Sequence, residues 1–171
     1  MKQIIYSIDR ADISAISALA KERSDGTQFV LIDSSILVMK HLLKLIKRFK
    51  FSSELLKLLI KLISGRNQLY IVVFQGMITS EGLVSFGVCN HYAVNKDDCI
   101  IGPVNTSASH QRKGFATFGL NSCLQALFHK PNCMRAFIDT REDNYAMQKV
   151  IEKSGFGKST SSYERTPNKQ L

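Results

Sequence analysis

The hydrophobic pattern of the chain changes at residue 69, and this change limits the folds that fit the sequence. Before it, residues 34–64 carry leucine and isoleucine at helical spacing, as in "HLLKLIKRFK" and "LLKLLIKLI". After it come three apolar, β-branched runs, "LYIVVFQGM", "GLVSFGVCNHYAV" and "CIIGPVNT", separated by "GMITSEG" and "NKDD", which are typical of turns. The pattern predicts amphipathic helices followed by three strands in an antiparallel meander.

The remaining segments alternate between strand and helix patterns. "QIIYSI", "CMRAFIDT" and a short stretch around Tyr163 predict strands, whereas "DRADISAISALAKER", "FATFGLNSCLQALFHK" and "DNYAMQKVIEKSGF" predict helices. Pro131 ends the second of these helices and Gly155 the third. The resulting order, β, α, α, β, β, β, α, β, α, β, predicts a mixed α/β sheet flanked by helices. With 171 residues we expect a single domain over 1–171, with 165–171 as a frayed tail.

The charge balance is strongly basic, with a formal net charge of +9. Such a balance favours an anionic partner, either a phosphorylated cofactor, a nucleic acid or an acidic surface, although solvated lysines on helix faces also account for it. A basic amphipathic segment such as 34–64 can lie on a membrane. We favour a helix that faces the core with its lysines in solvent, and therefore expect no membrane partner. The lysines form no patch with interleaved aromatics, so no nucleic acid is expected either.

The cysteines are dispersed, and their positions argue against a metal centre or a disulfide framework. Cys89, Cys99, Cys123 and Cys133 contain no C-x-x-C pair, so we expect no metal. The N-terminal residues do not resemble a signal peptide, and no uncharged run reaches the roughly 20 residues that span a bilayer. A cytoplasmic, reduced protein is expected.

The stretch "SHQRKGFAT", residues 109–117, joins the apolar run 99–106 to a helical pattern. A polar, glycine-containing turn at a helix start presents free backbone N–H groups, and the helix dipole favours anions there. The stretch therefore predicts a phosphate-binding loop. The alternative is that Gly114 only makes a turn and that the basic residues are solvated.

Residues 111–116, "QRKGFA", fit the pattern Q/R-x-x-G-x-G/A and resemble the acetyl-CoA motif of the GNAT superfamily of acyl-CoA N-acyltransferases. "DTREDNYAMQKVIEKSGF" resembles the second signature of that family, in the form found in the branch that acetylates the N-termini of ribosomal proteins. "YSIDRADISAISALA" resembles its first strand and helix. The resemblance implies a mostly antiparallel, twisted central sheet with a splayed strand pair. Residues 34–64 match no known motif, and we expect them to shape the acceptor site.

The resemblance further implies acetyl-CoA as the cosubstrate. The glycine of the loop lets the backbone approach a pyrophosphate closely, and the adjacent basic side chains add charge. The strand before the loop offers main-chain groups to the pantetheine arm, and the asparagine of the second signature contacts its amides. The expected acetyl-CoA residues are Val104, Thr106, Gln111, Arg112, Lys113, Gly114, Phe115, Ala116, Thr117 and Asn144.

The implied reaction is acetyl transfer to a primary amine by direct attack in a ternary complex, without a covalent enzyme intermediate. The backbone N–H of Val104 is the expected oxyanion donor. The acceptor, a small molecule or a protein N-terminus, is not specified by the sequence. A monomer or a homodimer is expected.

The acid and the base are less well defined. Many relatives place a tyrosine acid seven residues after the asparagine, where this chain has Ile151. The candidate bases are Glu81, His91, Asp97 and Asp98, and the candidate acid is Tyr145. An acyl-CoA-binding regulatory module with weak catalysis is the alternative function, because the tyrosine is missing and strand 99–106 lacks a carboxylate.

Overall fold

The fold was analysed in a computed structural model, which describes residues 1–12, 23–33, 35–50 and 52–165. The strands are β1 (Lys2–Asp9), β2 (Gln28–Ile32), β3 (Asn67–Phe74), β4 (Met77–Phe86), β5 (Asp98–Thr106), β6 (Arg135–Arg141) and β7 (Ser161–Glu164). The α-helices are α2 (Ser35–Phe49), α3 (Ser53–Ile63), α4 (Phe115–Phe128) and α5 (Tyr145–Lys153), and the 3-10 turns are η1 (Arg10–Asp12) and η2 (Ala108–His110).

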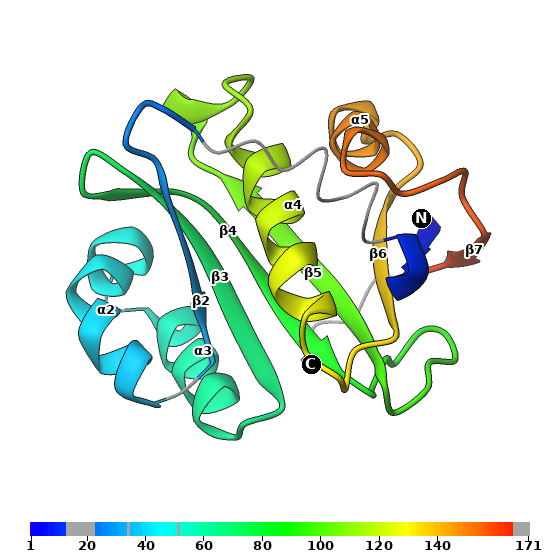
Figure 1. The fold of residues 1–171 in the computed structure, drawn as a ribbon, viewed down its shortest axis with the longest axis horizontal. Helices are drawn as coiled ribbons and strands as arrows, with labels where there is room; N and C mark the ends of the chain where they lie inside the picture. The colour runs from blue at the N-terminus through cyan, green and yellow to red at the C-terminus, as the bar shows by residue number, and fades with distance from the viewer. Residues whose placement is uncertain (13–22, 34, 51, 166–171) are drawn as a thin grey trace.

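The strands form one seven-stranded sheet in the order β2-β3-β4-β5-β6-β1-β7. All neighbours are antiparallel except β5 and β6, which are parallel. Helices α2 and α3 lie on one side of the sheet and α4 on the other, with α5 near β6 (Figure 1). The mixed α/β class with a mostly antiparallel sheet is therefore confirmed.

The sheet buries a separate core on each face, because successive residues of a strand point to opposite faces. On β3, Tyr70 packs in the core that includes Leu120 and Leu124 of α4. Its neighbour Ile71 packs in the second core, with Leu45 of α2 and other residues of the two helices. The near-continuous apolar run "LYIVV" is explained by this double burial.

Several sequence-based boundaries were wrong. Strand β2 was not expected, and it forms the sheet edge beside β3. The turn predicted at "GMITSEG" consists of Gln75 and Gly76 alone, whose φ values are 50° and 75°, and β4 begins at Met77. Positive φ at both central residues is typical of a tight hairpin turn. Residues 87–94, expected to continue a strand, contain no strand. Most of the predicted helix over 9–23 and the tail beyond Arg165 lie outside the described residues.

Candidate functional site

The parallel pair β5–β6 separates partway along its length. Pairing runs from Asp98 opposite Arg135 to Ile101 opposite Ile138, although β5 continues to Thr106 and β6 to Arg141. The separation coincides with an irregularity in the β4–β5 register, where Gly82 pairs with Val104 but Val84 pairs with Ile101. The expected splayed pair is thus present, and the backbone beyond Ile101 has no β6 partner.

Pro103 sits at this irregularity. It lacks an N–H, so it forfeits no ladder hydrogen bond on a strand segment that is paired on one side only. The β4–β5 register passes from Val104 to Ile101 without pairing this proline, which has no N–H to donate.

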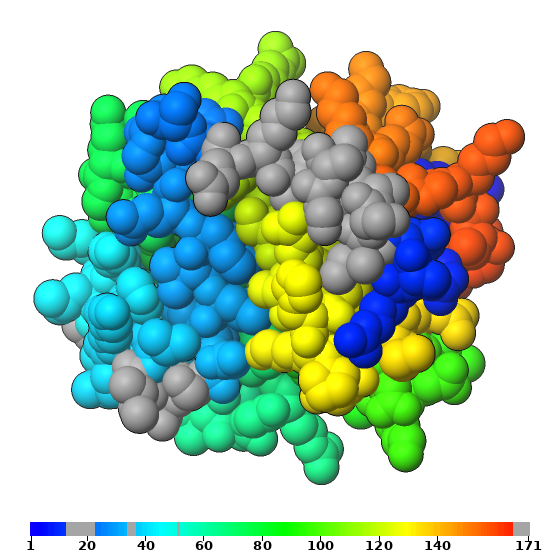
Figure 2. Space-filling model, viewed as in Figure 1, coloured from blue at the N-terminus to red at the C-terminus, as the bar shows by residue number. Residues whose placement is uncertain are grey.

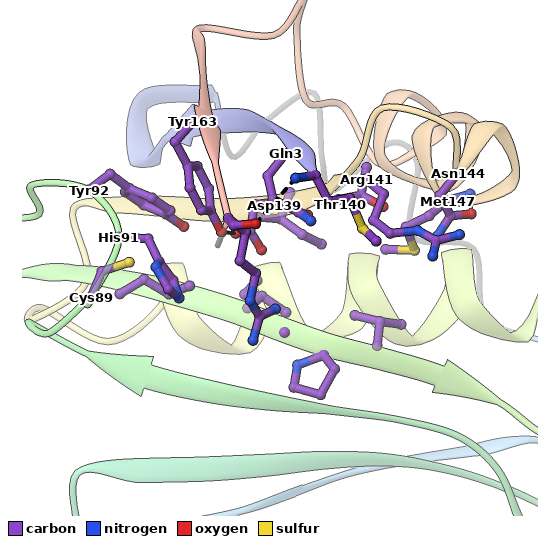
Figure 3. Close-up of a pocket in the computed structure, with 18 residues that line it drawn as sticks. Gln3, Cys89, His91, Tyr92, Asp139, Thr140, Arg141, Asn144, Met147 and Tyr163 are labelled. Atoms are coloured by element: carbon purple, nitrogen blue, oxygen red, sulfur yellow. Dashed lines mark hydrogen bonds between the residues drawn. The ribbon is translucent and has the colours of Figure 1, made fainter. Parts of the chain in front are cut away.

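A cavity of about 750 Å³ occupies the gap between the two strands (Figure 3). One wall is the segment 102–104 of β5 and the other is the segment 139–141 of β6. Asn144 and Met147 lie at one end of the view, and His91, Tyr92 and Tyr163 lie toward the other. The cavity is elongated and reaches from the start of α5 to the β4–β5 loop.

The loop that follows β5 leads directly into the N-terminus of α4. Gly114 is the N-cap residue, with φ of 80° and no side-chain cap, and Arg112 also has a positive φ of 62°. A glycine at the N-cap leaves the first N–H groups of α4 without a capping side chain. The helix dipole adds partial positive charge at the same place. The glycine turn at a helix start is confirmed, and phosphate binding there stays a prediction.

Arg23 adds a positive charge beside this loop, which sequence reasoning missed. Its Nη1 donates to the carbonyl of Lys113 at 2.9 Å, and its guanidinium lies 4.5 Å from the ring centroid of Phe115. An ion pair with Asp25 at 2.6 Å fixes its orientation and holds the pKa of Asp25 well below its usual range. Arg23 is 90 residues away from Lys113 in the chain, so no local pattern signals the contact.

Other expected cosubstrate residues have structural partners already. The side chain of Phe115 is buried, so only its main chain is available to a ligand. The Thr106 hydroxyl lies 3.1 Å from the hydroxyl of Ser80 on β4, and Gln111 donates to the Thr106 carbonyl at 3.4 Å. These contacts tie the loop to the end of β5. Ala116 and Thr117 follow in the first turn of α4.

Helix α5 contributes Asn144 to the cavity and Ile151 to the core. Asn144 is the N-cap, and its Oδ1 accepts from the backbone N of Met147 at 3.2 Å. Ile151 is fully buried in the α4-side core. Tyr145 is 70% exposed and does not line the large cavity. The helix therefore presents no tyrosine hydroxyl to this cavity.

A second cavity, of about 300 Å³, lies between α3 and the α2-side face of the sheet. Glu81 of β4 lines it, together with Pro103 and Asn105 of β5 and Lys57 and Lys61 of α3. Pro103 also lines the large cavity, so the two cavities adjoin at this residue.

The Glu81 carboxylate is buried, with 3% of the residue exposed, and accepts two hydrogen bonds of 2.9 Å from Arg48 of α2. Burial raises the pKa of Glu81 above its usual value, and the Arg48 guanidinium opposes that shift. A buried carboxylate with an elevated pKa is a better proton acceptor than a solvated one.

His91 lies at the opposite end of the large cavity from Asn144 (Figure 3). Its ring stacks on that of Tyr163, with 5.1 Å between centroids. The Tyr163 hydroxyl hydrogen-bonds Asp139 of β6, and burial raises the pKa of this tyrosine. The structure therefore brings His91 and Val104 to one cavity and Glu81 to the adjoining one.

Three of the four cysteines are buried away from the cavities. Cys99, Cys123 and Cys133 belong to the α4-side core, whereas Cys89 lines the large cavity. Within the described ranges, no group of three or more His, Cys, Asp or Glu residues is arranged to hold a metal ion.

Comparison with protein families matches residues 38–157 to the acetyltransferase (GNAT) domain. A comparison with curated protein sequences gives no match.

Solved structures show the same fold. The aminoglycoside 6'-N-acetyltransferase AAC(6')-Ih from Acinetobacter baumannii is 14% identical, with a TM-score of 0.58 over 84% of this chain and 99% of its own. AAC(6')-Iy, in complex with a CoA-containing bisubstrate analogue, is 14% identical, with a TM-score of 0.62 over 82% of this chain and 97% of its own.

A GCN5-related N-acetyltransferase from Kribbella flavida is 12% identical, with a TM-score of 0.55 over 93% of this chain. The chain spans only 55% of the length of that protein. A protein of unknown function from Staphylococcus epidermidis is 10% identical, with a TM-score of 0.56, and the chain spans 58% of its length. At these identities the likeness shows the fold.

Proposed function

The chain belongs to the GNAT acetyltransferase family, and from that premise we propose that it transfers the acetyl group of acetyl-CoA to a primary amine. The observation that carries the proposal is the separation of β5 from β6 beyond Ile101, beside the uncapped N-terminus of α4. An exposed strand edge and an anion site, joined by one loop, suit a ligand with an amide-containing arm and a pyrophosphate.

In this proposal the loop holds the phosphates of acetyl-CoA. The backbone N–H groups from Arg112 to Thr117 donate to phosphate oxygens, and Lys113 and Arg23 supply charge. Gly114 keeps the approach open because it has no side chain. Val104 and Thr106 pair with β4 on one side only, and their edge without a β6 partner binds the pantetheine arm as an added strand would, while Asn144 contacts it from α5. Gln111 positions the loop through its bond to the Thr106 carbonyl.

The transfer is a direct attack. The neutral amine nitrogen bonds to the thioester carbonyl carbon, and the backbone N–H of Val104 stabilises the oxyanion that forms. The carbon–sulfur bond then breaks, the amine proton passes to a base, and the products are the acetylated amine and CoA. An ordinary thiol such as that of CoA has a pKa of about 8.5, so the CoA thiolate can leave without a general acid to protonate it. Tyr145 has no role in this proposal.

We assign the base to Glu81, which acts through water, and the acceptor to the smaller cavity beside α3. Support comes from the burial of this carboxylate, its raised pKa and its place next to Pro103, where the cavities adjoin. His91 is the alternative base, since it lines the large cavity with Val104.

Calorimetric titration with acetyl-CoA, followed by CoA-thiol release with a panel of primary amines and N-terminal peptides, tests the proposal. Glu81→Gln keeps an oxygen for Arg48 but removes the base, and it should lower kcat/KM by about 100-fold without changing acetyl-CoA affinity. His91→Gln is the matched control and should retain most activity. A large loss in His91→Gln with normal activity in Glu81→Gln would move the base to His91.

The regulatory-module alternative predicts a different result in the same assay. It requires tight acetyl-CoA binding without steady CoA release for any amine in the panel. Failure to bind acetyl-CoA in a folded protein would reject both functions.

A further inference from the structure

The solvent-facing sides of α2 and α3 carry large aliphatic residues that the fold leaves uncovered. Met39 and Leu43 of α2 are 68% and 76% exposed. Leu56, Ile60 and Ile63 of α3 are 61%, 60% and 68% exposed. The sequence predicted lysines on the outer face and aliphatic residues in the core, and the structure shows aliphatic residues on both faces. Helix α2 forms the left margin of the molecule in Figure 2.

These aliphatic residues are not needed to attach the helices to the sheet. Val38 and Leu45 of α2 and Leu55 and Leu62 of α3 are buried in the core on that face. An inward apolar stripe is what a surface helix of a globular protein requires. The outward aliphatic residues form a second apolar stripe on each helix.

Each helix places a lysine stripe next to its outward aliphatic stripe. Lys40 and Lys44 each follow one position after Met39 and Leu43. On α3, Lys57 and Lys61 likewise follow Leu56 and Ile60. Residues four apart are neighbours on one helix face, so on each helix the lysines form one stripe and the exposed aliphatic residues form another. The lysine stripe and the aliphatic stripe of a helix lie about 100° apart around its axis.

The charge of this segment is almost entirely of one sign. Residues 35–63 contain seven basic residues and one acidic residue, Glu54. Arg48 is paired with Glu81, and the single Glu54 carboxylate offsets only one of the lysines, so the segment keeps a net positive charge. The surface therefore requires a partner that is both anionic and able to accept aliphatic side chains.

We propose that the outward face of α2 and α3 docks on a membrane surface that contains anionic lipid. An interfacial helix buries an apolar stripe at the headgroup boundary while flanking lysines contact anionic headgroups. A second copy of the chain would bring like charges together across the same face, which disfavours a dimer. Nucleic acid would use stacking aromatics, and the exposed large side chains of these helices are aliphatic.

The docking is interfacial and does not require insertion across the bilayer. Within the described part of the chain, no helix is long and apolar enough to cross a membrane. The proposal does not depend on the acetyl-transfer reaction.

Cosedimentation of the full chain with vesicles tests the proposal. We expect binding to phosphatidylcholine vesicles that contain phosphatidylglycerol, little binding to pure phosphatidylcholine, and loss of binding as salt is raised. Equal binding to both vesicle types, or none to either, would overturn it.

Two double variants separate the contributions of the stripes. Leu43→Gln with Ile60→Gln, and Lys40→Gln with Lys57→Gln, should each weaken binding to anionic vesicles by roughly tenfold or more. The matched control is Met77→Gln with Val88→Gln, which changes exposed aliphatic residues outside the two helices and should leave binding unchanged. Unchanged binding in both helix variants would refute the proposal. Light scattering that shows a dimer abolished by Leu43→Gln with Ile60→Gln, without vesicle binding, would assign the surface to a second copy instead.

Discussion

The guanidinium of Arg48 on α2 donates two hydrogen bonds of 2.9 Å each to the carboxylate of Glu81 on β4. This pair links α2 to the sheet, and its Glu81 lines the smaller cavity together with Pro103. Helix position and site electrostatics are therefore coupled through one ion pair.

Breaking this pair should destabilise the protein strongly. Arg48→Met leaves the buried Glu81 carboxylate without its charge partner, which should lower the free energy of unfolding by about 3 kcal/mol. In a Glu81→Gln background, where no charge is left behind, the same change should cost only about 1 kcal/mol. Urea unfolding of the four proteins measures the coupling, and equal costs in both backgrounds would contradict it.

A side chain at Gly114 should abolish acetyl-CoA binding. Gly114→Glu places a carboxylate at the proposed phosphate site and strains a residue whose φ is 80°. Gly65→Glu is the matched control, because Gly65 also has a positive φ, of 73°, with open space around it. Both variants should lose roughly 1–2 kcal/mol of stability from the backbone strain. Calorimetry should show loss of binding in Gly114→Glu alone, and normal binding there would move the site elsewhere.

Arg23 should contribute to phosphate binding although it lies outside the loop. Arg23→Gln removes a charge next to the Lys113 carbonyl and should weaken acetyl-CoA binding by about fivefold, mainly at low salt. Arg66→Gln removes a charge elsewhere on the protein and serves as the control. If both variants bind with the same affinity as the parent protein, Arg23 has no role in the site.

A tyrosine at position 151 should not supply the missing acid. Ile151 is fully buried, so Ile151→Tyr overpacks the core and should cost roughly 1–3 kcal/mol without raising turnover. Ile151→Val, which only removes a methyl group, should cost about 0.5–1.5 kcal/mol. Thermal melts and CoA-release assays measure both effects. Higher turnover in a stable Ile151→Tyr protein would show that the position reaches the reacting sulfur.

Acidification should destabilise the protein through His41 of α2. Burial lowers the pKa of His41, as do the charges of Lys44 and Lys40. Below the usual histidine pKa of about 6.5, His41 takes up a proton in the unfolded chain but not yet in the folded protein. The stability that is present above this pH is therefore lost as the pH falls toward the lowered pKa of His41 in the folded state. The decrease in Tm between pH 7.5 and 5 should be smaller in His41→Gln. Identical pH profiles would contradict this assignment.

The fold class and the glycine turn at the start of α4 could be predicted from the sequence, because both depend on local patterns. The residues "QRKGFA" combine a glycine that tolerates positive φ with the start of a helix, and each of these features is encoded within a few positions. Pro103 likewise marks the irregularity in β5 through its missing N–H. The strand β2 escaped prediction because its edge position leaves most of "QFVLI" only partly buried, without a clean alternation.

Contacts between side chains that are distant in the sequence depend on the tertiary structure. Arg23 reaches the loop, and Arg48 reaches Glu81, across sequence separations that no periodicity records. The burial of the aliphatic residues of α2 and α3 also depends on the tertiary structure. Helical spacing identifies several apolar positions in each helix, but only the positions that face the sheet are buried. Val38, Leu45, Leu55 and Leu62 are buried against this sheet face, whereas Leu43 and Ile60 remain exposed to solvent. The burial of a residue depends on its contacts with other helices and strands, so the sequence of one segment does not specify it.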